Sequence, residues 1–180
     1  MASLDEYKGH RFLLDACRLL VDDGIDVSLE LIGDGSLRAE LEAQIRRLGL
    51  GDRVAVRGRE PIEGVWEALR RADAMALASV QLESGFMDGI PNVLVEALAT
   101  GRPVVASSLP GIRELIIDDE TGLLAEPGDP RSLADAITRL VDEPELAPRL
   151  VATGRAKVEA EHDATRCLDE VYRRLSGLAP

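Results

Sequence analysis

The residues best suited to chemistry lie in one loop and the helix that follows it. Residues 82–91 contain Gly85 and Gly89, follow a predicted buried strand, and lead into a predicted helix that starts near Pro91 and Asn92. Free N–H groups and the positive dipole end at a helix N-terminus attract anions, and a nearby glycine permits close approach. The pattern therefore predicts a site for a diphosphate.

Two carboxylates belong to the same stretch. Asp88 either complements the helix dipole or accepts hydrogen bonds from neutral hydroxyls, since an acidic group repels phosphate. Glu96 lies one turn into the helix, four residues after Asn92, where its carboxylate could accept hydrogen bonds from a vicinal diol such as a ribose. The residues by themselves leave both the structural and the ligand-binding role open.

Lys8 is a further candidate. The chain has only two lysines, and Lys8 stands at the start of a predicted helix, where a cation is unfavourable to the dipole. A bound anion would offset that cost, whereas the alternative is an ordinary surface lysine.

Apolar periodicity predicts helices and strands in alternation, which requires crossover connections. We expect an α/β fold with a doubly wound, mainly parallel sheet, whose ligands bind outside the carboxyl ends of the strands. Such a domain should open on a strand, so a first strand is predicted to be missing. The expected helices cover about 9–23, 37–48, 63–71, 92–99, 112–116, 132–141, 145–159 and 165–175, and the strands about 27–32, 54–56, 74–78, 103–106 and 122–124.

Composition narrows the function classes. A length of 180 residues predicts one domain, and the net charge of -12 with 3% aromatic residues disfavours nucleic acid as a partner. No apolar run is long enough for a transmembrane helix and the N-terminus is acidic, so we expect a cytoplasmic protein. Cys17 and Cys167 stand far apart inside helical patterns, which favours buried free thiols over a disulfide or metal site.

Three further side chains are given structural roles. Trp66 lies on an apolar helical face and is expected in the core. His10 is interpreted as a helix residue close to the phosphate site, and His162 as a surface residue.

From Tyr7 onward the sequence resembles the donor-binding half of retaining glycosyltransferases of the group 1 type, which have two Rossmann-like domains (GT-B architecture) and an E-x7-E motif. The ordered matches cover about 170 residues, and each is weak alone. They are residues 8–10, the turn 31–37, the strand 54–58, 72–74, the E-x7-E-like segment 88–97, 101–106, 111–116 (where Glu114 is given a structural role) and 121–124.

The resemblance implies roles for individual residues. Asp88 stands at the acidic position that contacts donor-sugar hydroxyls, one methylene shorter than the family's Glu, and Glu96 at the position that holds the ribose. Lys8 would bind the donor phosphates and stabilise the departing diphosphate. Backbone groups around Gly89, Ile90, Pro91, Asn92 and Val93 would face the diphosphate and sugar, and Gly33, Arg59 and Glu60 would lie near the nucleotide.

The resemblance also implies what the chain lacks. Residues 1–180 would form the donor domain, with 145–180 as C-terminal helices, while the acceptor domain and a phosphate-binding Arg on the first strand would be absent. We therefore expect nucleotide-sugar binding without transfer by this chain alone, no metal or other cofactor, and an acceptor glycan or lipid met by the N-terminal domain. Peripheral association with the inner membrane face is one option for the full-length protein. Alternatives are a non-catalytic nucleotide-sugar-binding module and a retaining glycoside hydrolase, which also uses two carboxylates.

Overall fold

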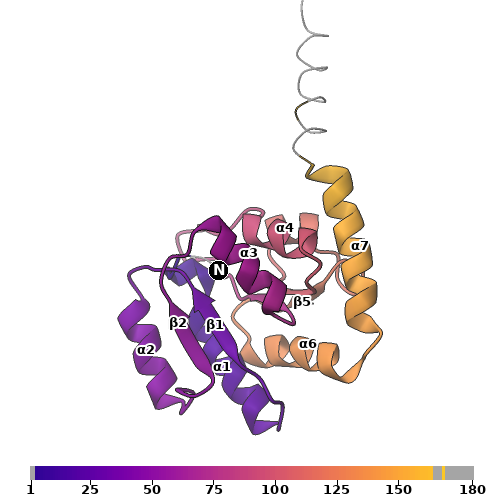
Figure 1. Ribbon diagram of the computed structural model, residues 1–180. Helices are drawn as coiled ribbons and strands as arrows, with labels where there is room; N and C mark the ends of the chain where they lie inside the picture. Colours follow the sequence, from indigo (N-terminus) through magenta and orange to yellow (C-terminus); the bar gives the residue numbers. More distant parts are fainter. Residues whose placement is uncertain (1–2, 164–167, 169–180) are drawn as a thin grey trace, which may run out of the picture.

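A computed structural model describes residues 3–163 and 168 of the chain (Figure 1). Helices and strands alternate as the periodicity predicts. The elements are η1 (Glu6–Lys8), α1 (His10–Asp22), β1 (Leu29–Ile32), α2 (Arg38–Arg47), β2 (Val54–Arg57), α3 (Ile62–Arg71), β3 (Met75–Leu77), α4 (Asn92–Ala99), β4 (Val104–Ser107), α5 (Pro110–Leu115), β5 (Leu123–Ala125), α6 (Pro130–Asp142) and α7 (Leu146–Glu161).

The strands pair only in parallel, but they form two sheets instead of the single one expected. β1 pairs with β2, and β3–β4–β5 form the second sheet, with Leu29 opposite Val54 and Met75 opposite Val104. In the doubly wound strand order 3-2-1-4-5-6, the first strand lies between the second and the fourth. The division between β1 and β3 therefore falls at the position that this order gives to the predicted missing strand.

Both faces of the strands are buried by helices, as in a doubly wound fold. Along β4, Val105 packs in a cluster with α1, α2 and α6, whereas Val104 and Ala106 pack in a second cluster with α4 and α5. Strand side chains alternate between faces, so each face requires its own helical layer. α1 joins the two sheets, because its apolar residues share the first cluster with Leu31 of β1 and Val105 of β4.

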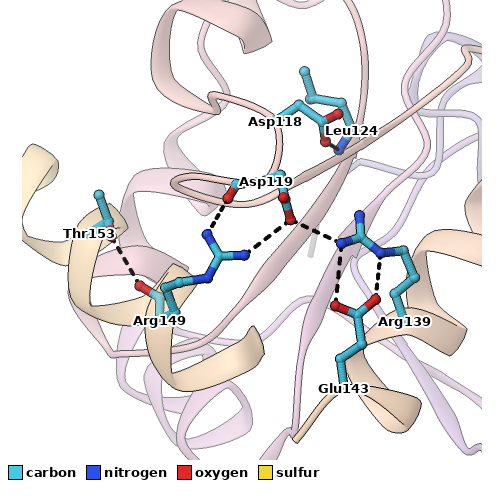
Figure 2. A network of polar contacts seen from close by, with 7 residues as sticks. All are labelled: Asp118, Asp119, Leu124, Arg139, Glu143, Arg149 and Thr153. Carbon is cyan, nitrogen blue, oxygen red and sulfur yellow. Dashed lines mark hydrogen bonds and ion pairs between the residues drawn. The ribbon is translucent and has the colours of Figure 1, made fainter. Parts of the chain in front are cut away.

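The turn before β5 is tied to the last two described helices (Figure 2). Asp119, which has a φ of 59°, accepts hydrogen bonds from Arg139 of α6 at 3.0 Å and Arg149 of α7 at 3.2 Å. Arg149 also donates to the Asp119 carbonyl oxygen at 2.5 Å. These contacts link the turn before β5 to α6 and α7.

The described elements confirm the predicted α/β class. The helix expected at 165–175 and Cys167 lie outside the described residues, while Cys17 is a buried free thiol and burial raises its pKa. The prediction for Trp66 is wrong, because its side chain is 41% exposed. Only the last turns of α3, with Ala68 and Leu69, are buried in the core.

Candidate functional site

A cavity of about 500 Å³ lies at the carboxyl ends of β1 and β2 and beside the start of α4. Its volume is in the range of small-molecule sites. Loops after parallel strands converge there, which is where the doubly wound fold is expected to bind ligands. The lining residues are Ser3, Tyr7, Lys8, Ile32, Gly33, Asp34, Arg59, Glu60, Ile62, Val65, Pro91, Asn92, Val93 and Glu96.

The N-terminus of α4 forms one wall. Pro91 has extended backbone dihedrals and precedes Asn92, the first helical residue, and no side chain among the described residues caps this end. Uncapped N–H groups and the dipole make this end attractive to an anion. Glu96 projects into the same cavity one turn further along, so a diphosphate at the helix start and a diol at Glu96 could belong to one ligand.

Lys8 is a further polar residue of the cavity lining, and its ammonium group is paired with a carboxylate. Its Nζ donates to Asp88 Oδ1 at 2.7 Å, and the two side chains are 12% and 11% exposed. Ser79 Oγ donates to the other carboxylate oxygen, Oδ2, at 2.5 Å. The Lys8 ammonium also lies 4.9 Å from the centroid of the Tyr7 ring. Asp88 therefore neutralises the charge of Lys8.

The segment that carries Lys8 is held by the end of β3. The Val80 N–H donates to the Tyr7 carbonyl oxygen at 2.8 Å. Gly9 has a φ of 64°, and a Cβ at this position would stand 1.8 Å from the Ala78 carbonyl oxygen. Only glycine permits that close approach in a left-handed conformation.

The remaining wall comes from the loops after β1 and β2. The Gly33 N–H donates to the Gly58 carbonyl oxygen at 3.1 Å, which joins the two loops. Arg59 and Glu60 are exposed and line the cavity, and Ile62 and Val65 of α3 add an apolar surface. This part of the cavity suits a flat, partly apolar group.

His10 follows Gly9 as the first residue of α1 and is 7% exposed. Burial lowers the pKa of His10 to about 4, and the neighbouring Lys8 charge acts in the same direction. His10 Nδ1 has no hydrogen-bond partner among the described residues. The imidazole is therefore neutral near pH 7 and adds no positive charge beside Lys8.

Eight of the predicted site residues line the cavity: Lys8, Gly33, Arg59, Glu60, Pro91, Asn92, Val93 and Glu96. Three do not. Asp88 points toward Lys8, the Gly89 backbone packs closely on Gly111 of α5, and Ile90 packs on the cluster around α4 and α5.

Several residues that line the cavity or hold its side chains were not predicted from the sequence. Asp34 lies inside the predicted turn, and Ile62 and Val65 follow Arg59 and Glu60 at helical spacing, so their positions were available from the pattern. No sequence signal pointed to Ser79 or to the Lys8–Asp88 ion pair, because these contacts join residues 9 and 80 positions apart.

The described residues show neither a metal-binding cluster nor a membrane-spanning helix. Within residues 3–163, no group of three or more His, Cys, Asp or Glu side chains is arranged to hold a metal ion. None of the helices in this part of the chain is long and apolar enough to cross a bilayer.

Comparison with known sequences gives a family match over residues 1–143 to the group 1 glycosyl transferases. The chain is 40% identical over 180 residues to the amylovoran biosynthesis glycosyltransferase AmsK of Erwinia amylovora, covering 98% of this chain and 44% of that protein. It is 36% identical over 165 residues to the putative colanic acid biosynthesis glycosyltransferase WcaL of Escherichia coli K12, covering 91% and 40%. The chain thus spans less than half the length of these relatives.

Solved structures resemble the chain over almost its whole length. The crystal structure of Anabaena Alr3699/HepE in complex with UDP and glucose matches with a TM-score of 0.86 and 27% identity, covering 99% of this chain and 47% of that one. The complex of HepE with UDP-glucose matches with a TM-score of 0.85, 27% identity and coverage of 99% and 48%. The shared fold is the Rossmann-like half of a GT-B protein.

Proposed function

Because the chain belongs to the group 1 glycosyltransferases, we propose that it is the donor-binding half of an enzyme that transfers a sugar from a nucleotide diphosphate sugar to an acceptor. One observation carries this proposal. A single cavity combines the uncapped start of α4, the Lys8 ammonium and the Glu96 carboxylate. These are the groups that a diphosphate and an adjoining ribose require.

Each part of the donor has a counterpart in the cavity. The diphosphate lies at the α4 start, where the N–H groups of Asn92 and Val93 and the Lys8 ammonium face it. The Glu96 carboxylate accepts hydrogen bonds from the ribose hydroxyls. The base lies along Arg59 and Glu60 near Ile62 and Val65, and Gly33 allows the nucleotide to approach the main chain.

Asp88 takes the donor sugar in this proposal. It is outside the cavity lining, but its carboxylate is fixed on Lys8 at the edge of the phosphate position. A carboxylate has lone-pair positions beyond those used by Lys8 and Ser79, so it can still accept a sugar hydroxyl. The residues around Gly89 and Ile90 lie next to it in the chain and would border the sugar.

Transfer breaks the bond between the anomeric carbon and the diphosphate oxygen and forms a bond to the oxygen of an acceptor hydroxyl, with retention of configuration. The proton of that hydroxyl passes to the departing diphosphate. The leaving diphosphate gains negative charge, which Lys8 and the α4 dipole stabilise. The residues provide positioning and electrostatic stabilisation, and we propose no metal or other cofactor.

The whole enzyme would need a second domain for the acceptor. The chain covers 44% of AmsK and 40% of WcaL, so the remainder of a protein of that length could supply it. AmsK and WcaL are named for amylovoran and colanic acid biosynthesis, which supports a role in exopolysaccharide synthesis. We place this reaction in the cytoplasm at the inner membrane face, with a glycan or lipid acceptor.

The hydrolase alternative fits the site less well. A glycoside hydrolase sets two carboxylates on either side of one glycosidic bond. Here Glu96 lines the cavity while Asp88 is neutralised by Lys8 and lies outside the lining. A non-catalytic binding module would share the site, and transfer by the chain joined to an acceptor domain would exclude it.

Titration calorimetry of the chain with UDP, GDP and ADP tests the proposal. We expect saturable binding of one nucleotide and a loss of about tenfold or more in affinity for Glu96→Gln, since the Gln amide offers one neutral acceptor oxygen in place of two charged ones and the charge-assisted hydrogen bonds to the ribose are lost. Glu114→Gln is the matched control, because Glu114 is exposed on α5 and does not line the cavity. No binding by the folded chain, or equal losses in both variants, would overturn the proposal.

A further inference from the structure

We propose that Ser79 is a positioning residue: it holds Asp88 in the orientation that pairs with Lys8, and through Asp88 it keeps the Lys8 ammonium at the diphosphate position. This inference rests on the proposed function, because it explains how the donor site is organised. Ser79 itself does not line the cavity.

Each carboxylate oxygen of Asp88 accepts a hydrogen bond from a different residue. Ser79 Oγ donates to Oδ2 at 2.5 Å, and Lys8 Nζ donates to Oδ1 at 2.7 Å. The Ser79 side chain has no exposed surface, and the ion pair is nearly buried. With one oxygen fixed by a buried hydroxyl, the carboxylate is restrained to an orientation in which the other oxygen faces Lys8.

Asp88 needs such a restraint because it lies in an irregular loop. Residues 78–91 connect β3 to α4 without a helix or strand, and most side chains from Gln81 to Gly89 are exposed or half-buried. Ser79, in contrast, stands two residues after the end of β3, and its chain neighbours Ala78 and Val80 are also buried. The Ser79 hydroxyl therefore restrains the Asp88 carboxylate, which lies in a loop, from a buried position close to the sheet.

The two chain neighbours of Ser79 hold the segment that carries Lys8, the other partner of the ion pair. The Val80 N–H binds the Tyr7 carbonyl oxygen, and the Ala78 carbonyl oxygen lies where only a glycine fits at position 9. Consecutive residues at the end of β3 thus hold the segment that carries Lys8 and, through Ser79, the side chain of Asp88. The relative position of cation and carboxylate is set by one stretch of backbone.

This arrangement has a consequence for binding. A lysine side chain loses considerable conformational entropy when it is ordered, and the contact with Asp88 already orders Lys8. An ammonium has three N–H donors, so Lys8 can keep Asp88 and still donate to a phosphate oxygen. Ser79 would therefore raise donor affinity without touching the donor.

The chain offers a direct test because Lys8 and Lys157 are its only lysines. Lys157 pairs with Glu161 in α7 and serves as an internal reference. We would acylate the unliganded chain with limiting acetic anhydride and measure the Lys8-to-Lys157 ratio by mass spectrometry of the peptides. Ser79→Ala should raise that ratio by about fivefold, the shift expected from one hydrogen bond of ordinary net strength.

Three variants make the result specific. Asp88→Asn should raise the ratio at least as much, and Ser79→Thr, which keeps the hydroxyl, should return it close to wild type. Ser107→Ala is the matched control, because Ser107 is equally buried at the carboxyl end of β4 and should leave the ratio unchanged. A Ser79→Ala ratio equal to wild type, or equal to that of Ser107→Ala, would overturn the inference.

Ligand binding then separates this inference from the proposed function. In UDP titrations, Ser79→Ala should weaken binding about fivefold, whereas in a Lys8→Ala background the same change should have no further effect. An equal loss in both backgrounds would show a merely structural role for Ser79. If no nucleotide binds the wild type, the proposed function fails, while the acylation ratios still report whether Ser79 holds the ion pair.

Discussion

Two sets of ion pairs in this molecule use similar side chains in different surroundings. Lys8 and Asp88 pair beside a cavity, with 12% and 11% of their side chains exposed. Asp119 pairs with Arg139 and Arg149 on the outer surface, where the exposed fractions run from 42% to 52% (Figure 2). The first set is largely shielded from solvent, and the second is open to it.

The difference shows how burial assigns a role to a charge. The Arg139 guanidinium, and then Arg149, lower the pKa of Asp119 below its ordinary value, but water and salt screen this network. It ties a turn to α6 and α7, and its Arg149 and Glu143 line a second cavity of about 370 Å³ that is built from the α6–α7 connection and includes no strand end. The Lys8–Asp88 pair is screened less and stands beside a helix N-terminus, so its charges can act on a ligand.

Gly9→Ala should lower the free energy of unfolding more than the other substitutions, because it disturbs the buried region around Lys8. The left-handed φ and the contact with the Ala78 carbonyl oxygen leave no room for a methyl group. We expect a loss of about 4 kcal/mol or more in the free energy of unfolding, measured in urea.

Gly24→Ala is the control for Gly9→Ala. Gly24 has a φ of 84°, but within the part of the chain that the structure describes no atom lies within 4 Å of a Cβ placed there. The loss should be only about 1 kcal/mol, due to backbone strain alone. Equal losses in the two variants would show that the packing of Lys8's segment on β3 contributes nothing.

His10 makes the buried region sensitive to pH. Its pKa is about 4 in the folded chain against 6.5 unfolded, so the unfolded state binds more protons between these values. The contribution of neutral His10 to the free energy of unfolding is complete above pH 6.5. It is lost as the pH falls toward 4, by up to about 3 kcal/mol. His10→Leu should flatten this part of the pH dependence of unfolding, whereas His162→Ala should not; equal slopes in His10→Leu and the wild type would contradict the prediction.

Asp88→Asn sharpens the comparison at the ion pair itself. Removing the carboxylate charge leaves a nearly buried ammonium without its counter-charge, and we expect a loss of about 2 kcal/mol in unfolding free energy. The value should change little with salt. An unchanged stability would mean that Lys8 finds solvent or another partner at no cost.

Asp119→Asn should have the smallest effect. Asparagine tolerates the positive φ of this position, so the substitution removes charge without adding strain. We expect a slight destabilisation in low salt that disappears at about 1 M NaCl, where the Debye length is short. A larger loss than that of Asp88→Asn would reverse the roles assigned to the two sets.

The sequence was sufficient for most of the fold because its signals are local. Helical spacing located α1 and α4, and the Asn92 start of α4 follows directly from Pro91. The division into two sheets was not predicted, since strand pairing depends on contacts between distant segments. Trp66 was assigned to the core because its spacing matches Leu69, but spacing does not say how far along α3 the core extends.

Most residues of the site could be predicted from the sequence, but the contacts between their side chains could not. Glu96, Asn92 and Arg59 do line one cavity. The pairing of Lys8 with Asp88 and the role of Ser79 depend on how loop 78–91 folds against η1, and no spacing rule encodes that.

The most direct test of the account is a crystal structure of the chain soaked or grown with UDP. We predict the ribose hydroxyls within hydrogen-bond distance of Glu96 and the diphosphate at the start of α4, within reach of Lys8 while Lys8 keeps its contact with Asp88. UDP bound elsewhere, or with its diphosphate away from the α4 start and Lys8, would contradict the assignment of this cavity as the donor site.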